Sequence, residues 1–295
     1  MVDITVIIPT KNEERNLAFC LEPLKEWASK IVVVDSNSTD QTHAIAGRYN
    51  AEVILFDYRG GWPKKRQFVI DTYSFETGWI LLLDADEILT EESKAEIAAA
   101  IQKSDFDGYY LWFGMEFLGR VLKRSDPGLR KLSLFRTGKG NFEKRYGNQD
   151  ESMGDMEVHE HVIVDGNVGE LKSTVLHRNF NNLSRFIIKH DEYSNYECKV
   201  HTSGEQTPLK AKFWGKKEER RRYLKKRLIR NPIAPIAYFC YLYVIRGGFL
   251  EGRPGFYYVL YQCIYLYFVN SKIYEAEHVT TPESVDSLVD CQRLK

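Results

Sequence analysis

The segment Trp79–Glu87 constrains the fold more than any other part of the sequence. Its unbroken apolar run, Trp79–Leu83, ends at the sequence Asp-Ala-Asp-Glu. A short continuous apolar run with polar flanks predicts a strand of a parallel sheet that is buried on both faces. Alternate side chains of a strand point the same way, so Asp84 and Asp86 can converge on one hard cation. Ligands of open α/β sheets bind at this end of the strands. The alternative is that these carboxylates only precede a helix at 90–103.

The first hundred residues repeat a strand and helix alternation. Predicted strands at 4–8, 31–34, 52–56 and 79–83 are separated by helical patterns, the first of which places Leu17, Cys20, Leu21 and Leu24 on one face. Helices are also predicted at 41–49 and 66–72. This alternation predicts an α/β fold, with a mostly parallel sheet and helices on both of its faces.

Polar clusters follow the predicted strands. Asp35 ends the second strand, where its carboxylate can accept hydrogen bonds from a base or a ribose, while Ser36 and Ser38 form a turn before the next helix. Lys65 and Arg66 either face a diphosphate or belong to a solvated basic loop. The sequence contains neither GxGxxG after the first strand nor GxxxxGK[ST]. This absence favours a nucleotide bound through a metal held by carboxylates.

Three motifs together resemble a known family. Residues 7–13 (IIPTKNE), 33–40 (VVDSNSTD) and 83–86 (LDAD) are similar in order and spacing to the pattern of glycosyltransferase family 2, whose members have the GT-A fold. The resemblance implies an inverting transferase that uses a nucleotide-sugar, usually a UDP-sugar, together with a divalent metal, Mn²⁺ or Mg²⁺.

The resemblance also implies roles for individual residues. Thr10 and Glu13 would line the nucleotide pocket, Asp35 would contact uracil, and Arg66 would lie near the base or the phosphates. Asp86 would ligate the metal, and Asp84 would contact the metal or the ribose. The implied nucleotide-sugar site comprises Pro9, Thr10, Asn12, Glu13, Asp35, Ser36, Ser38, Lys65, Arg66, Asp84 and Ala85.

A second concentration of chemical groups lies at residues 157–161 (EVHEH). Inverting transfer requires a carboxylate that deprotonates the acceptor hydroxyl. This segment resembles the His-Glu motif of the lipopolysaccharide-core glucosyltransferase-like branch of family 2. We predict Glu160 as the base, with Glu157 as the alternative, and His159 and His161 as contacts of the acceptor or the diphosphate.

His177 ends a short segment, 175–177 (VLH), which also matches that branch. Neutral imidazole commonly joins carboxylates around Mn²⁺, so we predict His177 as a further metal ligand or a diphosphate contact. The alternative is a structural histidine.

Composition changes near the C-terminus. Lys216–Arg230 contains nine basic and two acidic residues, and two aromatic-rich apolar runs follow at 233–245 and 255–269. Each run is shorter than the roughly 20 residues that a spanning helix needs. Aromatic surfaces beside a basic run suit the headgroup region of a membrane, so Lys216–Val269 predicts membrane-surface attachment. The alternatives are packing on the catalytic domain or an oligomer interface; no module for nucleic-acid binding is evident.

These observations predict three segments. Residues 1–205 form a GT-A catalytic domain, 206–279 a helical membrane-associating region and 280–295 a frayed tail. Five cysteines without a CxxC pair and an N-terminus without signal-peptide features predict a cytoplasmic location. With the basic tail, the prediction becomes peripheral attachment to the cytoplasmic face of a bacterial inner membrane.

The predicted activity is transfer of a hexose, in this branch glucose, from a UDP-sugar to a membrane-linked glycan such as lipopolysaccharide core or a polyprenyl-linked saccharide. Two alternatives remain. One is a non-catalytic membrane scaffold on a transferase fold. The other is a sugar-nucleotide pyrophosphorylase, which needs a glycine-rich loop with arginine after the first strand, whereas this sequence has Pro9-Thr10-Lys11-Asn12 there.

Overall fold

The computed structural model describes residues 1–103, 105–126, 128–144, 161–178, 182–202 and 227–279. The chain divides into two compact units. Unit 1 comprises Met1–Arg185 and Tyr241–Val259, and unit 2 comprises Phe186–Cys240 and Leu260–Lys295. This division differs from the predicted boundary at 205/206. The three predicted segments, including the tail at 280–295 outside the described residues, stay a prediction.

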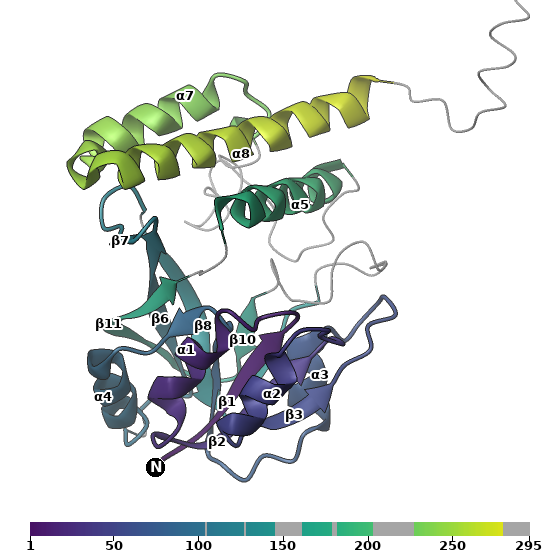
Figure 1. Cartoon of the computed structure of the whole chain (residues 1–295), viewed down its shortest axis with the longest axis vertical. Helices are drawn as coiled ribbons and strands as arrows, with labels where there is room; N and C mark the ends of the chain where they lie inside the picture. Colours follow the sequence, from purple (N-terminus) through teal and green to yellow (C-terminus); the bar gives the residue numbers. More distant parts are fainter. Residues whose placement is uncertain (104, 127, 145–160, 179–181, 203–226, 280–295) are drawn as a thin grey trace, which may run out of the picture. The chain divides into compact units, whose positions relative to one another are not determined.

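Unit 1 is built on a sheet of nine strands among the described residues (Figure 1). Their order is β3-β2-β1-β4-β8-β6-β11-β5, with β7 paired to β6, and β9 and β10 form a separate hairpin. The strands are β1 Val2–Thr10, β2 Ala28–Asp35, β3 Glu52–Leu55, β4 Trp79–Leu82, β5 Glu87–Ile88, β6 Gly108–Phe117, β7 Arg120–Val121, β8 Leu129–Arg136, β9 Gly140–Phe142, β10 Val162–Val164 and β11 Val168–Arg178.

The sheet has a parallel half and a mixed half. Strands β3, β2, β1 and β4 run parallel to one another, as predicted. Strand β8 runs antiparallel to both β4 and β6, and β5 runs antiparallel to β11. The expectation of a mostly parallel sheet is therefore correct only for the first half. The short connection between β6 and β8 permits only antiparallel pairing, because a parallel crossover needs a dozen or more residues.

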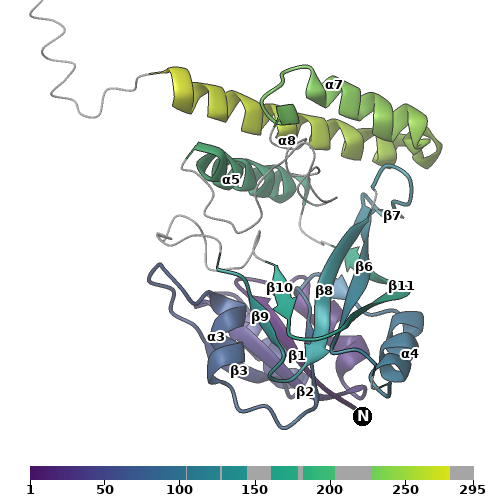
Figure 2. The same ribbon diagram turned by 180° about the vertical axis from the view of Figure 1, so that it is seen from behind.

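Helices cover both faces of the parallel half, shown from opposite sides in Figures 1 and 2. Alternate residues of the strands belong to two separate cores, because successive side chains point to opposite faces. Val6 and Leu81 pack with the first core, and Ile7 and Ile80 pack with the second. Helices α1 (Leu17–Leu21), α2 (Thr42–Arg48) and α4 (Glu91–Ala100), with the 3₁₀ turn η1 (Glu22–Leu24), contribute to the first core, and α3 (Lys65–Thr72) contributes to the second.

The predicted apolar patterns are confirmed in this half. The four residues of the first helical pattern, Leu17, Cys20, Leu21 and Leu24, are fully buried. Strand β4 is buried along its whole length, as a strand between β1 and β8 must be. After the parallel half, Asn141 and Phe142 belong to β9 and pair with Ile163 and Val162 of β10. Residues 145–156 lie outside the described part of the chain.

A second chain segment completes unit 1. It comprises most of the π-helical turn η3 (Cys240–Ile245), the 3₁₀ turn η4 (Gly248–Glu251) and the start of α8 (Gly252–His278). Gly247 and Gly252 flank η4 with φ of 75° and 66°, a conformation that favours glycine. The buried carboxylate of Glu251 accepts backbone hydrogen bonds from Lys123 (2.5 Å), Arg124 (2.8 Å) and Ser125 (2.9 Å), and one from the Ser125 hydroxyl. Glu251 therefore fastens this segment to the loop after β7.

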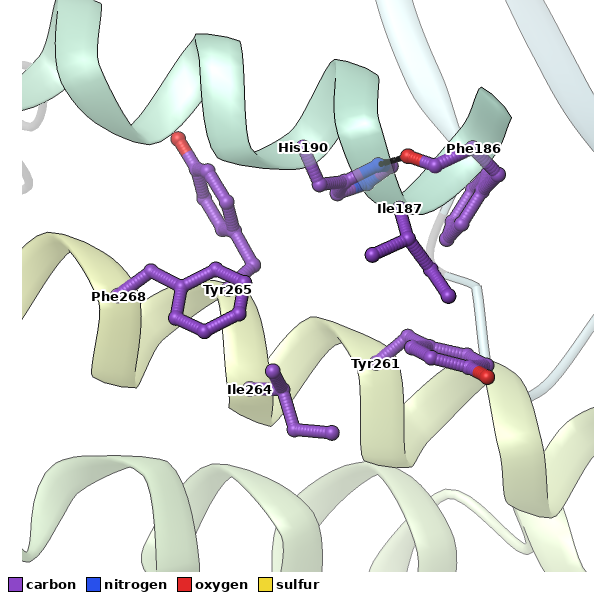
Figure 3. Close-up of a pocket in the computed structure, with 7 residues that line it drawn as sticks. All are labelled: Phe186, Ile187, His190, Tyr261, Ile264, Tyr265 and Phe268. Carbon is purple, nitrogen blue, oxygen red and sulfur yellow. Dashed lines mark hydrogen bonds between the residues drawn. The ribbon is translucent and has the colours of Figure 1, made fainter. Parts of the chain in front are cut away.

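Unit 2 contains most of α5 (Leu183–Thr202), α7 (Ala234–Phe239) and the rest of α8. Lys272 of α8 donates hydrogen bonds to Asp191 (2.5 Å), Ser194 (2.7 Å) and Asn195 (2.6 Å) of α5. A cavity of about 30 Å³ between these two helices has room for one or two water-sized groups (Figure 3). Its lining is apolar and aromatic: Phe186, Ile187, His190, Tyr261, Ile264, Tyr265 and Phe268.

The C-terminal apolar runs form helices, and the second run lies within the 27-residue α8. Among the helices in the described ranges, none combines the length and the apolar composition needed to cross a membrane.

Replacing Glu251 with alanine should destabilise unit 1. The substitution would leave the backbone N–H groups of Lys123, Arg124 and the buried Ser125 without their acceptor, and an unsatisfied buried donor costs about 1–3 kcal/mol. Urea unfolding followed by tryptophan fluorescence measures the effect. Glu251→Gln, which keeps one acceptor oxygen, should lose less. The matched control is Glu76→Ala at an exposed site; an equal loss in both alanine variants would contradict the fastening role.

Candidate active site

The carboxylates after β4 form an ion-paired cluster. Asp84 pairs with Arg66 at the start of α3, and the Nζ atom of Lys131 in β8 lies 3.2 Å from Asp84 Oδ2. The same ammonium group pairs with Glu87 and lies 4.2 Å from the centre of the Phe113 ring. The end of β4 thus supplies Asp84, β5 supplies Glu87, and the two cations come from α3 and from the antiparallel strand β8.

Mutual pairing determines the charge states in this cluster. Burial opposes ionisation of Asp84, but Arg66 and Lys131 outweigh it and hold the pKa of Asp84 well below its usual value. Burial, assisted by the nearby charge of Asp84, raises the pKa of Glu87 although Lys131 acts against the shift. Burial alone would lower the pKa of Lys131, but Asp84 and Glu87 raise it above its ordinary value. Lys131 therefore remains cationic beside the carboxylates.

Asp86 has a different partner. Its Oδ2 atom lies 3.1 Å from Nε2 of His177, and its side chain is almost fully buried. His177 lies near the end of β11, directly opposite Glu87 of β5 in the strand register. Burial alone would lower the pKa of His177, but the adjacent Asp86 carboxylate raises it to about 9. The structure therefore brings Asp84, Asp86 and His177 to one place, and their roles as metal ligands stay a prediction.

This donor set fits a metal that the substrate helps to hold. Among the residues with defined positions, no group of three or more His, Cys, Asp or Glu side chains is arranged to hold a metal ion by itself. Mg²⁺ is commonly bound through one or two carboxylates together with substrate phosphates. Asp86 supplies such a carboxylate, and His177 would add an imidazole nitrogen, which loses its proton when it becomes a ligand.

The ends of β1 and β2 are joined by hydrogen bonds around Asp35. Its Oδ1 atom accepts from the hydroxyls of Thr10 (2.7 Å) and Ser38 (2.5 Å). Its Oδ2 atom accepts from the Ser38 backbone N–H and pairs with His43 Nε2, each at 2.7 Å. Burial would raise the pKa of Asp35, but these hydrogen bonds outweigh it and lower the pKa. Asp35 is therefore a buried, ionised carboxylate.

The remaining predicted nucleotide-sugar residues lie at the same sheet edge. Asn12 has φ of 55° and accepts a hydrogen bond from the Thr39 backbone (2.9 Å), and its own N–H donates to Ser38 Oγ (2.8 Å). The buried Lys65 ammonium donates to Thr10 O (2.8 Å). Glu13 accepts from the Asn16 side chain (2.7 Å). Pro9 is in β1 and Ala85 is buried after β4.

Ser36 carries an unsatisfied polar atom. Its Oγ atom is buried and has no hydrogen-bond partner within the described part of the chain. Buried hydroxyls are normally paired, so this atom marks a place where a ligand or water can bind, directly after Asp35.

The predicted base segment is not placed. Glu157, His159 and Glu160 lie outside the described residues. His161 is exposed, and its backbone N–H donates to Glu143 Oε1 at 3.3 Å. The predicted roles of these four residues stay predictions.

Sequence reasoning missed three residues of the site: Lys131, Glu87 and His43. His43 follows Asp35 by eight residues, so it could have been found from the sequence as a neighbour of a buried carboxylate. Glu87 was read as part of the polar run without a role. No local signal indicates Lys131, because its contact with Asp84 depends on the antiparallel pairing of β8 with β4.

Comparison with known proteins establishes the family. Residues 5–162, more than half of the chain, match the family model "Glycosyl transferase family 2". The chain belongs to this family, and it is therefore a glycosyltransferase. Its α/β sheet with helices on both faces agrees with the GT-A-like fold that the motifs imply.

Two relatives illustrate the similarity. The lipopolysaccharide core biosynthesis glycosyltransferase LpsC of Rhizobium meliloti is 29% identical over 302 residues, which cover 96% of each chain. An uncharacterized glycosyltransferase of Rickettsia conorii is 26% identical over 202 residues, covering 66% of this chain and 69% of the relative.

Solved structures show weaker likenesses. Staphylococcus aureus TarS 1–349 in complex with UDP has a TM-score of 0.42 and 16% identity, with 95% of this chain and 92% of that chain covered. Mycobacterium tuberculosis glucosyl-3-phosphoglycerate synthase with Mn²⁺, UDP and glucosyl-3-phosphoglycerate has a TM-score of 0.37 and 14% identity, with 65% and 77% covered. Both TM-scores lie below 0.5, and the proposals below do not rest on them.

The stability that His177 contributes should depend on pH. Its pKa is higher in the folded chain, about 9, than in the unfolded chain, about 6.5. The contribution is therefore complete below pH 6.5 and is lost as the pH rises through 9. His177→Gln should lower the free energy of unfolding by about 2 kcal/mol at pH 6, less than the full shift implies because the side chain is partly exposed.

The measurement is urea unfolding between pH 5.5 and 9.5 in buffer that contains EDTA. The difference between wild type and variant should shrink as the pH rises. A difference that is constant or grows with pH would contradict the ion pair with Asp86. His278→Gln, at an exposed histidine of α8, is the control.

Proposed function

We propose that this glycosyltransferase moves a hexose, glucose in the branch that it resembles, from a UDP-sugar to a membrane-linked glycan with inversion at the anomeric carbon. The observation that carries the proposal is the arrangement after β4, where Asp86 with His177, and Asp84 with Arg66 and Lys131, meet at the carboxyl end of the strand. Nucleotide ligands of α/β sheets bind at this edge.

The donor would bind along the ends of β1, β2 and β4. We propose that Asp35 and the unsatisfied hydroxyl of Ser36 receive the nucleoside. Arg66 and Lys131 supply positive charge for the diphosphate, and neither needs to lose a proton to do so. Asp84 keeps both cations at this position in the absence of the donor.

We propose a divalent cation, Mn²⁺ or Mg²⁺, with Asp86 and His177 as its protein ligands. When bound, it would offset the negative charge that develops on the departing diphosphate. Asp86 Oδ2 and His177 Nε2, which lie 3.1 Å apart, are the two protein donor atoms that this proposal uses.

The proposed reaction is an in-line displacement. Glu160 accepts the proton of the acceptor hydroxyl while that oxygen forms a bond to C1 of the hexose. The bond between C1 and the diphosphate oxygen breaks on the opposite side, and UDP leaves with the bonding electron pair. Glu157 is the alternative base.

The acceptor we propose is lipopolysaccharide core or a polyprenyl-linked saccharide. The similarity to LpsC over nearly the whole chain supports this choice, since that relative is described as acting in lipopolysaccharide core biosynthesis. The basic and aromatic composition of Lys216–Val269 supports attachment to the cytoplasmic face of a bacterial inner membrane.

Titration of UDP by calorimetry, with and without Mn²⁺, tests the donor site. Wild type should bind UDP more tightly with Mn²⁺, and Asp86→Ala should lose about 10- to 100-fold of the metal-dependent affinity, because it removes a charged ligand. Asp40→Ala, outside the ion cluster, is the control. Wild type without UDP binding would contradict the proposal and favour the non-catalytic scaffold.

Substitution of the two candidate bases tests the chemistry. Glu160→Gln should reduce kcat by about 10²- to 10⁴-fold and leave UDP affinity unchanged, because the amide cannot accept the proton. Glu157→Gln should have a smaller effect. Single-turnover transfer from radiolabelled UDP-glucose to lipopolysaccharide core measures both. The reverse order of the two losses would assign the base to Glu157.

A further inference from the structure

Unit 1 carries an apolar and basic surface that includes residues outside the predicted membrane segment Lys216–Val269. It is formed by the tip of the hairpin between β6 and β7 and by the segment 241–257. We call it the hairpin-turn surface. Its exposed apolar residues are Leu118, Val121, Tyr241, Val244, Ile245, Phe249, Leu250 and Tyr257. Ile245 is 76% exposed and Val244 is 59% exposed. A group of large apolar side chains with this exposure indicates a surface that contacts an apolar partner or environment.

Fixed contacts hold the two parts together. Arg120 of the hairpin donates a hydrogen bond to Leu250 O at 3.3 Å, and Phe117 packs edge-on against Tyr258 with ring centres 5.5 Å apart. The Glu251 carboxylate ties the same turn to the backbone at Lys123. Figure 1 shows β7 beside the start of α8. The hairpin and the turn therefore present their exposed side chains as one rigid element.

The charges of this surface have one sign. Residues 117–125 and 241–259 include five cations, Arg120, Lys123, Arg124, Arg246 and Arg253. The one carboxylate in these two segments, Glu251, is 5% exposed and accepts hydrogen bonds from backbone N–H groups. The solvent-exposed side chains of this surface named above are therefore apolar or positively charged. Tyrosine, phenylalanine and arginine around aliphatic tips match the interface of a membrane that contains anionic lipids.

We propose that the hairpin-turn surface inserts its apolar side chains into the headgroup region of an anionic membrane, so that unit 1 itself contacts lipid. The proposed contact joins residues 241–257, which lie within the predicted membrane segment Lys216–Val269, to the hairpin of β6 and β7, and it does not use the basic run Lys216–Arg230. The five cations are complementary to anionic lipid headgroups, each contributing to adsorption within a Debye length of the surface.

The position of this surface explains how a lipid-linked acceptor meets the donor site. Met115 of β6 is the register partner of His177, and Leu118 follows it by three residues. At 3.3 Å per residue, the hairpin tip lies about 10 Å along the strand from the His177 position. An acceptor in the membrane thus lies within a sugar unit or two of the catalytic edge. This consequence rests on the proposed function, whereas the lipid contact does not.

Flotation with vesicles tests the proposal on the full chain. Vesicles of phosphatidylcholine with 30% phosphatidylglycerol are compared with pure phosphatidylcholine. Wild type should float with the anionic vesicles. Ile245→Glu with Phe249→Glu should lower partitioning more than tenfold, and Lys123→Gln with Arg253→Gln about thirtyfold, at roughly fivefold for each cation.

Matched control variants test whether a loss of flotation is specific to the hairpin-turn surface. Leu55→Glu in β3 is an equally exposed aliphatic control, and Lys25→Gln with Lys103→Gln is the charge control. Both should float as wild type does. UDP calorimetry on every variant separates the two proposals, because loss of flotation with intact UDP binding concerns this surface alone.

Four outcomes would overturn the inference. Wild type could fail to float, or the hairpin-turn variants could float as wild type does. Loss of flotation only on replacement of Arg220, Arg221 and Arg222 by glutamine would assign the contact to the basic run. Sedimentation that shows a dimer abolished by Ile245→Glu, without flotation of wild type, would assign the surface to a second copy of the chain.

Discussion

Neutralisation of buried carboxylates at the end of β4 is the constraint on which the rest of unit 1 depends. Asp84, Asp86 and Glu87 follow a strand that is covered on both faces, so their charges cannot be left to solvent. Isolated buried charges are strongly unfavourable, and each must find a partner. Arg66 from α3, Lys131 from β8 and His177 from β11 fill that requirement. Three elements far apart in sequence are thereby fixed around one strand end.

The parallel half of the sheet could be predicted because its signals are local. The continuous apolar runs of β1, β2 and β4 and the spacing of Leu17, Cys20, Leu21 and Leu24 each specify an element within a few residues. Parallel strands place their carboxyl ends together, so the sequence alone predicts Thr10, Asp35 and Asp84 at one edge of the sheet.

The mixed half could not be predicted in the same way. Lys131 occurs in a strand whose sequence does not specify its neighbour, and its role follows only from the pairing of β8 with β4. The same holds for Glu87, which forms a two-residue strand on β11 opposite His177. The fastening by Glu251 joins positions more than 120 residues apart. Such contacts are set by tertiary packing, and a single sequence carries no period or spacing for them.

The hydrogen bonds around Asp35 have a consequence for how selective the proposed donor pocket would be. Each of its two oxygen atoms already accepts two hydrogen bonds, from Thr10, Ser38 and His43. A base that donates to Asp35 must therefore replace one of these donors, so the contact is an exchange and adds little net affinity. A base without a suitably placed N–H would displace one of these donors and would form no hydrogen bond to Asp35 in its place. Discrimination between bases at this position would then arise from the hydrogen bond to Asp35 that the wrong base removes without replacing it.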